Sequence, residues 1–271
     1  MDTKKIVVSI LGCGWYGLEL AKELVKNGYP VKGSTTRTEK FALLRDSGIM
    51  PYLVQFDEKG EDFDAEFFKS EVLIICIPPK RSTAEQHTFL SKLERIATAA
   101  ARQLIKHVIF ISSTSVYGDR NIEVDENTDP QPDSDSGKAI RSAELLLKNT
   151  TGFDTTILRF GGLIGPGRDP GRFFAGKSDI PNGDAPVNLI HLQDCIGITM
   201  QIIDQHTYGD IINACSADHP DRASFYTAAA LRSGLEKPTF RRELLSWKIV
   251  SSVLLEEKLK YRFKVKLNSL V

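Results

Sequence analysis

The chain has 271 residues, of which 41% are hydrophobic, so it is long enough for one large α/β unit or for one domain with an appendage. Acidic and basic residues number 35 each, so no net charge attracts the chain to nucleic acid or to a membrane surface. The four cysteines follow no metal-binding or disulfide pattern, and no apolar run reaches the roughly 20 residues that span a bilayer. We expect a cytoplasmic protein without a metal, and neither nucleic acid nor a membrane as its partner.

Through the first 160 residues, short apolar runs alternate with amphipathic stretches. Residues 6–11 form a short run that is apolar except for Ser9, which is typical of a strand buried on both faces of a parallel sheet. The helical pattern of residues 15–27 follows and ends at Gly28. Further strands are predicted at 31–35, 52–56, 72–77, 107–112 and 155–159, and further helices at 38–46, 83–104 and 138–149.

This alternation predicts an α/β fold with a Rossmann-type, doubly wound parallel sheet. Glycine and proline become dense between residues 161 and 186, where we expect loops over a cleft. Helical patterns return at 192–205, 221–233 and 247–260. We therefore predict a dinucleotide-binding domain over 1–160 and a small, mostly helical C-terminal lobe over 161–271. The lobe is expected on the substrate side, interleaved with the first domain.

A Gly-x-Gly-x-x-Gly sequence stands directly after the first predicted strand and opens the first predicted helix. This context turns a weak pattern into a dinucleotide-binding fingerprint. The first glycine permits a tight turn, a side chain at the second would block the pyrophosphate, and the third lets helix and strand pack closely. The N–H groups of the helix N-terminus then favour phosphate. The residues assigned to this part of the cofactor site are Gly12, Cys13, Gly14, Trp15, Tyr16 and Gly17.

The end of the second predicted strand favours NADP over NAD. Chains that prefer NAD have Asp or Glu about 20 residues after the glycines, where the acid bonds the ribose hydroxyls. This chain has Thr36 and Arg37 there, and a guanidinium pairs well with a 2′-phosphate, although both residues also suit a helix cap. Asp57, after the third strand, is expected near adenine or in a turn. Ile77 and Pro78 are expected beside the cofactor ribose, where Pro78 also suits a purely conformational role.

Three later segments resemble the motifs of one enzyme family, and they occur in the same order. Residues 111–118 read Ile-Ser-Ser-Thr-Ser-Val-Tyr-Gly, residues 158–167 read Leu-Arg-Phe-Gly-Gly-Leu-Ile-Gly-Pro-Gly, and residues 188–194 read Asn-Leu-Ile-His-Leu-Gln-Asp. Together with the glycine loop, they make the chain similar to the extended short-chain dehydrogenase/reductases, the NAD-dependent epimerase/dehydratase family. The resemblance covers nearly the whole chain and implies a Rossmann fold with bound NAD(P).

The resemblance also implies a proton relay that this chain lacks. In the family a Ser or Thr orients the substrate oxygen, a Tyr passes the proton, and a Lys four residues on lowers the pKa of the Tyr. Ser113 matches the Ser or Thr. When the segments are aligned on Glu144, Ser136 stands at the Tyr position and Ile140 at the Lys position. The chain thus resembles an atypical member of the family in which both chemical groups are missing.

Other side chains are candidates for these roles and for substrate binding. Tyr117 is a candidate proton donor, with Lys138 as the cation that lowers its pKa. The alternatives are a structural Tyr117 and a solvated Lys138 at the start of a helix. Arg168 and Arg172 lie in the loop-rich region and are candidates for binding an anionic substrate such as a nucleotide diphosphate, although both also suit an exposed surface. His191 is a candidate for facing the substrate.

Two functions are consistent with these patterns. The first is an NADP-dependent oxidoreductase or epimerase with an altered proton relay, which acts on a small-molecule substrate either alone or as a homodimer. The second is a catalytically inactive protein that senses NAD(P) and passes the signal to a partner. The retained Ser113 and the loop-rich cleft favour the enzyme, whereas the missing Tyr and Lys favour the sensor.

Overall fold

The chain divides into two compact, interleaved units in the computed structural model, which describes residues 5–57, 60–79 and 83–270, without the side chains of Asp57 and of residues 83–87. The first unit combines the chain up to Ser112 with two later segments, Asp135–Leu158 and Ile202–Ile211. The second combines Ser113–Ser134, Arg159–Gln201 and the chain from Ile212 onward. One of the breaks between the units, between Leu158 and Arg159, lies next to the boundary expected at residue 160.

A central sheet of eight strands has the order β11-β8-β6-β5-β1-β2-β3-β4. The chain starts at β1 in the middle of the sheet and adds β2, β3 and then β4 on one side. It then crosses over and adds β5, β6, β8 and β11 on the other side. This reversal is the doubly wound topology, and it confirms the predicted α/β fold class. The strands are β1 (Val8–Leu11), β2 (Val31–Thr35), β3 (Met50–Asp57), β4 (Gly60–Phe63), β5 (Val72–Ile75), β6 (His107–Ser113), β8 (Asp154–Phe160) and β11 (Ile211–Ala214).

The strand β1 pairs in parallel with both β2 and β5, and the pairs β2–β3 and β5–β6 are also parallel. All four residues of β1 and of β5 are buried, as expected for strands covered on both faces. The antiparallel edge strand β4 was not predicted. Its sequence Gly-Glu-Asp-Phe is exposed at its centre and carries no apolar alternation, so no local pattern indicates a strand there.

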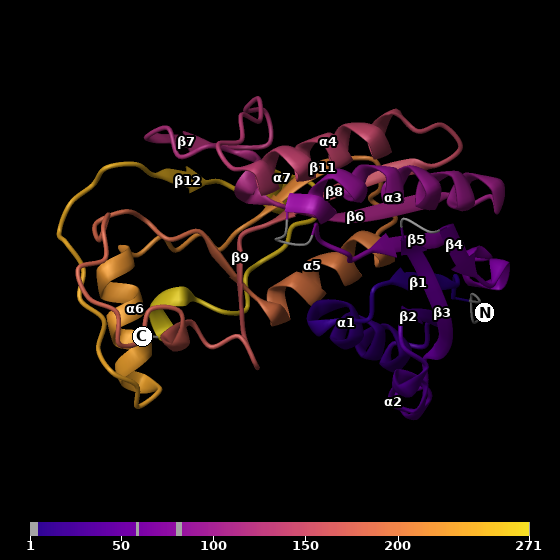
Figure 1. Cartoon of the computed structure of the whole chain (residues 1–271), viewed down its shortest axis with the longest axis horizontal. Helices are drawn as coiled ribbons and strands as arrows, with labels where there is room; N and C mark the ends of the chain where they lie inside the picture. The colour runs from indigo at the N-terminus through magenta and orange to yellow at the C-terminus, as the bar shows by residue number, and fades with distance from the viewer. Residues whose placement is uncertain (1–4, 58–59, 80–82, 271) are drawn as a thin grey trace. The chain divides into compact units, whose positions relative to one another are not determined.

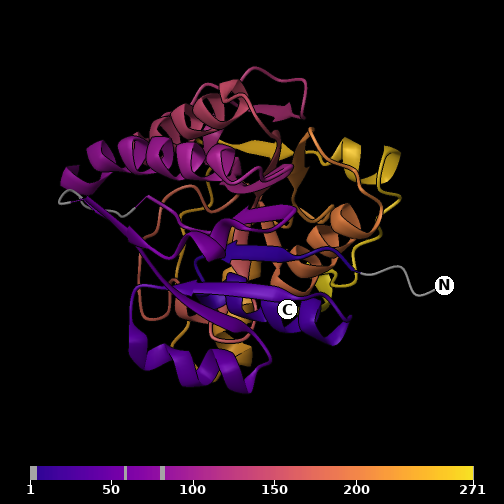
Figure 2. The same cartoon turned by 90° about the vertical axis from the view of Figure 1, so that its right-hand side faces the viewer.

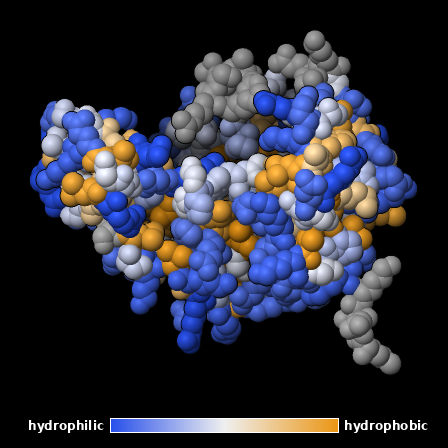
Figure 3. All heavy atoms as spheres, turned by 90° about the horizontal axis from the view of Figure 1, so that it is seen from below, coloured by the Kyte–Doolittle hydropathy of each residue, from blue (hydrophilic) through white to orange (hydrophobic). Residues whose placement is uncertain are grey.

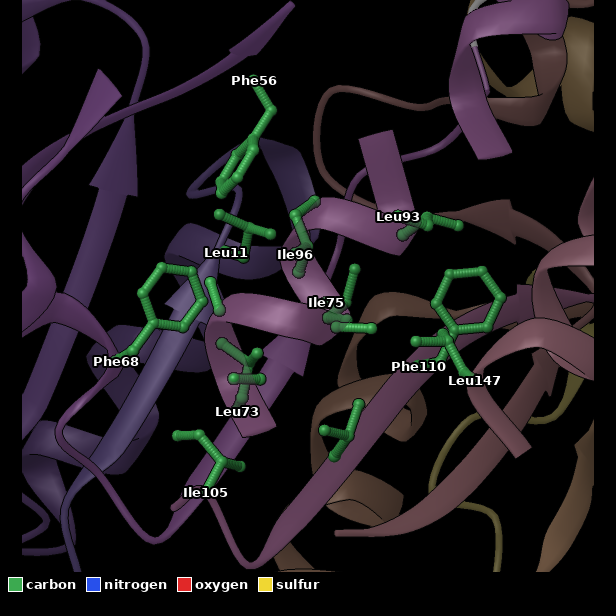
Figure 4. Close-up of a cluster of buried hydrophobic side chains, with 14 of the residues drawn as sticks. Leu11, Phe56, Phe68, Leu73, Ile75, Leu93, Ile96, Ile105, Phe110 and Leu147 are labelled. Carbon is green, nitrogen blue, oxygen red and sulfur yellow. The ribbon is translucent and has the colours of Figure 1, made fainter. Parts of the chain in front are cut away.

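Helices cover both faces of this sheet in the first unit. Figures 1 and 2 show α3 and α4 on one face and α1 and α2 on the other. The core under α3 is a cluster of buried side chains in which Leu73 and Ile75 of β5 meet Leu93 and Ile96 of the helix (Figure 4). The helices are α1 (Trp15–Lys26), α2 (Phe41–Asp46), α3 (Thr83–Arg102) and α4 (Asp135–Asn149), with 3-10 turns η1 (Thr38–Lys40) and η2 (Ala65–Phe68).

The second unit holds short strands as well as helices. Two parallel pairs, β7–β12 and β9–β10, lie outside the central sheet. Its elements are η3 (Thr114–Val116), β7 (Ile122–Val124), β9 (Gly162–Ile164), η4 (Pro170–Arg172), β10 (Leu189–His191), α5 (Leu192–Asp204), α6 (Arg222–Arg232), β12 (Lys248–Val250), α7 (Val253–Glu257) and η5 (Leu267–Leu270).

The helix predicted over residues 247–260 is wrong. Lys248–Val250 forms β12, and the helix that follows is only Val253–Glu257. The backbone N–H of Trp247 donates to Asn121 Oδ1 (2.9 Å), and the N–H of Asn121 donates to the Trp247 carbonyl oxygen (2.8 Å). These long-range bonds start the pairing of β12 with β7, and they outweigh the local helical pattern.

No helix among the described residues is long and apolar enough to cross a membrane. Hydrophilic side chains predominate on the face shown in Figure 3, and hydrophobic residues are scattered between them.

Candidate functional site

The glycine loop leaves β1 in a conformation that its first and third glycines require. Gly12 has φ of +103°, and its N–H donates to Ser34 Oγ at the end of β2 (2.8 Å). A Cβ added at Gly17 would lie 2.2 Å from the Gly12 carbonyl oxygen, so only glycine lets α1 pack this closely on the loop. Both positions match the roles expected of a dinucleotide-binding turn.

Gly14 is different, because no protein atom lies within 4 Å of a Cβ added there. Its φ of −90° is open to any residue, so the fold itself does not require glycine at this position. Gly14 is the N-cap of α1 and offers no side chain to the N–H groups of the first turn. The open space in front of a helix N-terminus fits the pyrophosphate of a dinucleotide.

A cavity of about 250 Å³ opens beside this loop, entirely within the first unit. It is smaller than the roughly 300–1,000 Å³ typical of whole ligand sites, so it suits one half of a dinucleotide. It includes residues at the end of β2, which is where the adenosine ribose lies in Rossmann folds. The cavity is lined by Leu11, Gly12, Cys13, Gly14, Ser34, Thr35, Thr36, Lys40, Val54, Phe56, Ile77, Lys92 and Ile96.

The floor of this cavity is the outer edge of the hydrophobic core. Leu11, Phe56 and Ile96 line the cavity and also belong to the buried cluster in Figure 4. They come from β1, β3 and α3, three elements that are fixed by the sheet and by the packing below it. A flat apolar ring such as adenine therefore meets a rigid apolar surface here.

Five of the residues assigned to the cofactor from the sequence line the cavity, namely Gly12, Cys13, Gly14, Thr36 and Ile77. Burial raises the pKa of the Cys13 thiol to about 12, so this side chain acts as a small apolar group. Asp57 ends β3, but its side chain lies outside the described residues. The remaining assigned residues do not line the cavity and are Trp15, Tyr16, Gly17, Arg37 and Pro78.

Two lysines of this cavity were not predicted from the sequence. Lys40 ends η1 and Lys92 belongs to α3, so neither stands in the glycine loop or at a strand end. Lys40 follows Arg37 by three residues, and a search for cations just after the second strand would have found it. Nothing local distinguishes Lys92 from a solvated helix residue.

A second cavity, of about 310 Å³, lies entirely within the second unit. Hydroxyl, amide and charged side chains make up much of its wall, next to the aromatic rings of Tyr226 and Trp247. This lining suits a small polar ligand. The cavity is lined by Ser113, Thr114, Ser115, Asp119, Gly162, Ala185, Pro186, Val187, Asn188, Leu189, Arg222, Tyr226, Ser246, Trp247 and Lys248.

Ser113, the predicted orienting hydroxyl, is part of this cavity. It ends β6, and its Oγ accepts a hydrogen bond from the Ser115 N–H (3.1 Å), which fixes the side chain at the start of η3. No described residue accepts the hydroxyl hydrogen, so Ser113 can donate it to the oxygen atom of a ligand.

Lys248 was not among the site residues predicted from the sequence, yet it lines the same cavity as Ser113. Its ammonium donates to the Tyr117 carbonyl oxygen and to Asp119 Oδ1, both at 2.7 Å, and the side chain is only 13% exposed. An ammonium has three N–H groups. These two bonds orient the Lys248 ammonium and, as far as the described residues are concerned, leave its third N–H for a ligand.

Tyr117 is buried away from that cavity, with 2% of its surface exposed. Arg159 donates to its hydroxyl oxygen (2.6 Å), and the hydroxyl lies 2.8 Å from the Asp125 carbonyl oxygen and 3.1 Å from Asn213 Oδ1. Burial raises the pKa of Tyr117. These contacts argue against the predicted proton transfer and favour the structural alternative.

The other predicted polar residues also lie elsewhere. Lys138 is exposed in the first turn of α4, in the other unit from Tyr117, and pairs with Asp135 (3.3 Å). Arg168 and Arg172 are exposed and do not line the cavity of the second unit, whereas Arg222 does. His191 accepts a hydrogen bond from the Gln193 N–H at Nδ1 (3.2 Å), and burial lowers its pKa.

The segment aligned with the family's Tyr and Lys is the first part of α4. Ser136 is exposed there and Ile140 is buried. One turn later the buried Glu144 accepts from the Ser112 hydroxyl (2.6 Å) and from Arg141 (3.2 Å). Glu144 thus fastens α4 to the end of β6.

Comparison with known proteins agrees with this geometry. The model of a family described as NAD(P)H-binding matches residues 12–190, which include the glycine loop and most of the sheet. The chain belongs to this NAD(P)H-binding family. It is also 40% identical to Protein YeeZ of Escherichia coli (strain K12) over 245 residues, which cover 89% of each chain.

Two solved structures have the same fold as this member of the NAD(P)H-binding family. UDP-glucuronic acid 4-epimerase from Bacillus cereus, in complex with NAD, has a TM-score of 0.78 and 18% identity, covering 96% of this chain and 94% of that chain. A short-chain dehydrogenase/reductase superfamily protein from Agrobacterium tumefaciens, with bound NAD, has a TM-score of 0.77 and 15% identity, covering 97% and 94%. At these identities the likeness concerns the fold alone.

Proposed function

We propose that this protein is an NADP-dependent oxidoreductase of the epimerase/dehydratase type, with a proton relay that differs from the Tyr–Lys pair of its relatives. The observation that carries the proposal is the cavity of the second unit, which both Ser113 and Lys248 line. A hydroxyl and an ammonium are the two groups needed to hold a substrate oxygen and to protonate it.

The glycine loop and the cavity of the first unit would hold the dinucleotide, which would supply or accept hydride when bound. In the direction of reduction, the Ser113 hydroxyl donates a hydrogen bond to the substrate carbonyl oxygen and orients it. The Lys248 ammonium transfers a proton from Nζ to that oxygen as negative charge develops there. Asp119, which accepts from the same ammonium, holds Nζ in place, and solvent restores the proton afterwards.

The substrate class follows from the size and lining of the cavity. At about 310 Å³ it lies at the lower end of ligand sites, and its polar groups suit a small hydroxylated carbonyl compound. Arg222 adds a cation that has no ion pair within the described part of the chain, so a substrate with one anionic group fits as well. Lys248, by contrast, is already paired with Asp119.

The test is NADPH oxidation with a panel of small aldehydes, ketones and sugar carbonyls, measured by absorbance. For the compounds that react, Lys248→Met should lower kcat by about 10²- to 10⁴-fold, which is the usual contribution of a positioned acid. Lys248→Arg should lose a similar factor while keeping its unfolding midpoint, because a guanidinium retains the charge but does not release its proton.

Lys138→Met is the matched control, since this exposed lysine pairs only with Asp135 among the described contacts, and it should leave kcat unchanged. Tyr117→Phe should lower stability without a comparable loss of kcat. A Tyr117→Phe variant that folds but has lost turnover, beside an active Lys248→Met, would instead make Tyr117 the acid.

The second candidate is a protein that senses NAD(P) without turnover. The observation in its favour is α4, where an exposed Ser136 and a buried Ile140 stand in place of the relay. Binding of NADPH without oxidation by any compound of the panel would select the sensor over the oxidoreductase.

A further inference from the structure

Asn188 holds the backbone of β12 with both ends of its side-chain amide. Its Nδ2 donates to the Lys248 carbonyl oxygen (2.8 Å), and its Oδ1 accepts from the Val250 N–H (2.9 Å). The two bonds flank Ile249, as the bonds from a neighbouring strand would. At the other edge, β12 pairs in parallel with β7, where Ile249 lies opposite Glu123. The amide of Asn188 therefore takes the place of a strand at one edge of β12.

The backbone of Asn188 is itself fixed. The Gly162 N–H donates to the Asn188 carbonyl oxygen (2.8 Å), and Asn188 stands directly before β10, which pairs with β9. A Cβ added at Gly161 would lie 3.0 Å from the same oxygen, and one at Gly162 would lie 3.4 Å from it. The two glycines thus let the chains approach closely, and the Asn188 side chain connects the β9–β10 pair to β12.

Lys248 is held at both of its ends. Asn188 binds its carbonyl oxygen, and its ammonium donates to the Tyr117 carbonyl oxygen and to Asp119 Oδ1, both at 2.7 Å. Asn188, Lys248 and Ser113 all line the cavity of the second unit. A lysine has a long and flexible stem, so its ammonium keeps one place only if its backbone does. A displacement of β12 would therefore move the ammonium relative to the Ser113 hydroxyl.

We propose that Asn188 is a positioning residue, which places the Lys248 ammonium for proton transfer by holding β12 beside this cavity. The inference rests on the proposed function, because it takes Lys248 as the acid. Asn188 itself transfers no proton, since its amide is bound to β12 and it acts through Lys248. A misplacement of about 1 Å costs on the order of 100-fold in rate, so the loss of the two bonds should lower kcat.

The test is a double-mutant cycle on the full-length protein, with NADPH and a carbonyl compound that the unmodified protein reduces. Asn188→Ala removes both bonds and should lower kcat by about 10- to 100-fold, with KM for the compound within about threefold. In the Lys248→Met background, the same change should lower kcat by less than about twofold, because the group that Asn188 positions is gone. A purely structural role would lower kcat by the same factor in both backgrounds.

Asn188→Asp serves in the same cycle if the alanine variant does not fold. The carboxylate has the size of the amide and still accepts from the Val250 N–H, but it does not donate to the Lys248 carbonyl oxygen. It should lower kcat only where Lys248 is present.

Amide hydrogen exchange followed by NMR gives a measurement apart from activity. In Asn188→Ala, the Val250 N–H loses its acceptor and should exchange faster. The Ser251 N–H donates to the Val124 carbonyl oxygen of β7 (2.8 Å) and should change less. Unchanged exchange at Val250 would contradict the proposed hold on β12.

Asn182→Gly is the matched control. Asn182 also binds a nearby backbone with its amide, since Nδ2 donates to the Ser246 carbonyl oxygen (2.5 Å) and Oδ1 accepts from the Leu245 N–H (2.8 Å). Its φ of +63° suits glycine, so the substitution removes the side-chain bonds without straining the backbone. This variant should have a lower unfolding midpoint, while its kcat stays within about twofold of the unmodified protein.

The outcomes separate the two proposals. A loss of kcat in Lys248→Met, together with full kcat in Asn188→Ala or with equal losses in both backgrounds, overturns the positioning role and leaves Lys248 as the acid. Full kcat in Lys248→Met, or no turnover of any compound by the unmodified protein, removes the acid and the positioning role together.

Discussion

At the scale of single residues, substitutions at Gly14 and Gly17 distinguish an effect on ligand binding from an effect on folding. A Cβ added at Gly14 meets no neighbouring side chain, so Gly14→Val should lower the free energy of unfolding by no more than about 1 kcal/mol, the usual cost of a poor N-cap residue. The same side chain occupies the place of the pyrophosphate, and binding of NADPH should be abolished. Calorimetric titration and thermal unfolding of the one variant measure both effects.

Gly17→Ala is the contrasting variant, because its Cβ meets the Gly12 carbonyl oxygen at 2.2 Å and the helix must move. It should lose stability along with binding. A folded Gly14→Val protein that binds NADPH with unchanged affinity would show that the pyrophosphate lies elsewhere.

The sequence reveals site residues only where their determinants are local. The glycine loop could be predicted because a strand, three glycines and a helix start follow one another directly. Lys248 could not, since its partner Asp119 is 129 residues away along the chain and no pattern links them. Tyr117 lies in a motif, but only its buried contacts with Arg159 and Asn213 show where its hydroxyl points.

At the scale of elements, the strands of the central sheet could be predicted from local sequence, whereas the short strands outside it could not. Residues 72–77 were predicted as a strand and contain β5, since burial on both faces produces a continuous apolar and mostly β-branched run. The strands β7 and β12 have three residues each, and each is defined by its partner rather than by its own composition. Elements this short are determined by tertiary contacts, which the hydrophobic periodicity of the sequence does not indicate.

Asp169 fastens η4 to α6 and gives the second unit a pH-dependent contact. Ser233 Oγ donates to Asp169 Oδ2 (2.7 Å), and the Gly171 N–H donates to Oδ1 (2.9 Å). The hydrogen bond from Ser233 is the main cause that lowers the pKa of Asp169. A carboxyl whose pKa is lower in the folded state stabilises the protein above its unfolded pKa of about 4, and this contribution is lost as the pH falls.

Ser233→Ala should therefore lower the free energy of unfolding by about 0.5–1.5 kcal/mol at pH 7. The difference from the unmodified protein should be smaller at pH 3, which lies below the unfolded pKa of about 4, because this contribution is lost as the pH falls towards the lowered folded-state pKa of Asp169. Urea unfolding at the two pH values measures it. A difference that is the same at pH 7 and pH 3 would mean that the carboxylate is not the group that Ser233 stabilises.

At the scale of the whole molecule, the cofactor cavity and the cavity with Ser113 belong to different compact units. Hydrogen exchange with 2′,5′-ADP should therefore slow in peptides of the glycine loop, of residues 34–40 and of the middle of α3. Peptides that contain residues 185–189 and 246–248 should exchange at the same rate with and without this fragment. Equal protection of both sets would show that adenosine binding alone couples the two units.

The interleaving of the units also sets the order in which the molecule can be completed during synthesis. Every residue that lines the cofactor cavity lies before residue 97, yet the first unit includes Ile202–Ile211. A ribosome that adds about 5–20 residues per second therefore exposes the whole cavity-forming segment several seconds before the last part of its unit emerges. During that interval β8 lacks its neighbour β11, and the nascent chain presents an unpaired strand edge. Early dinucleotide binding at the glycine loop would stabilise the growing chain in this exposed state, so cofactor supply and protein yield should be linked in the cell.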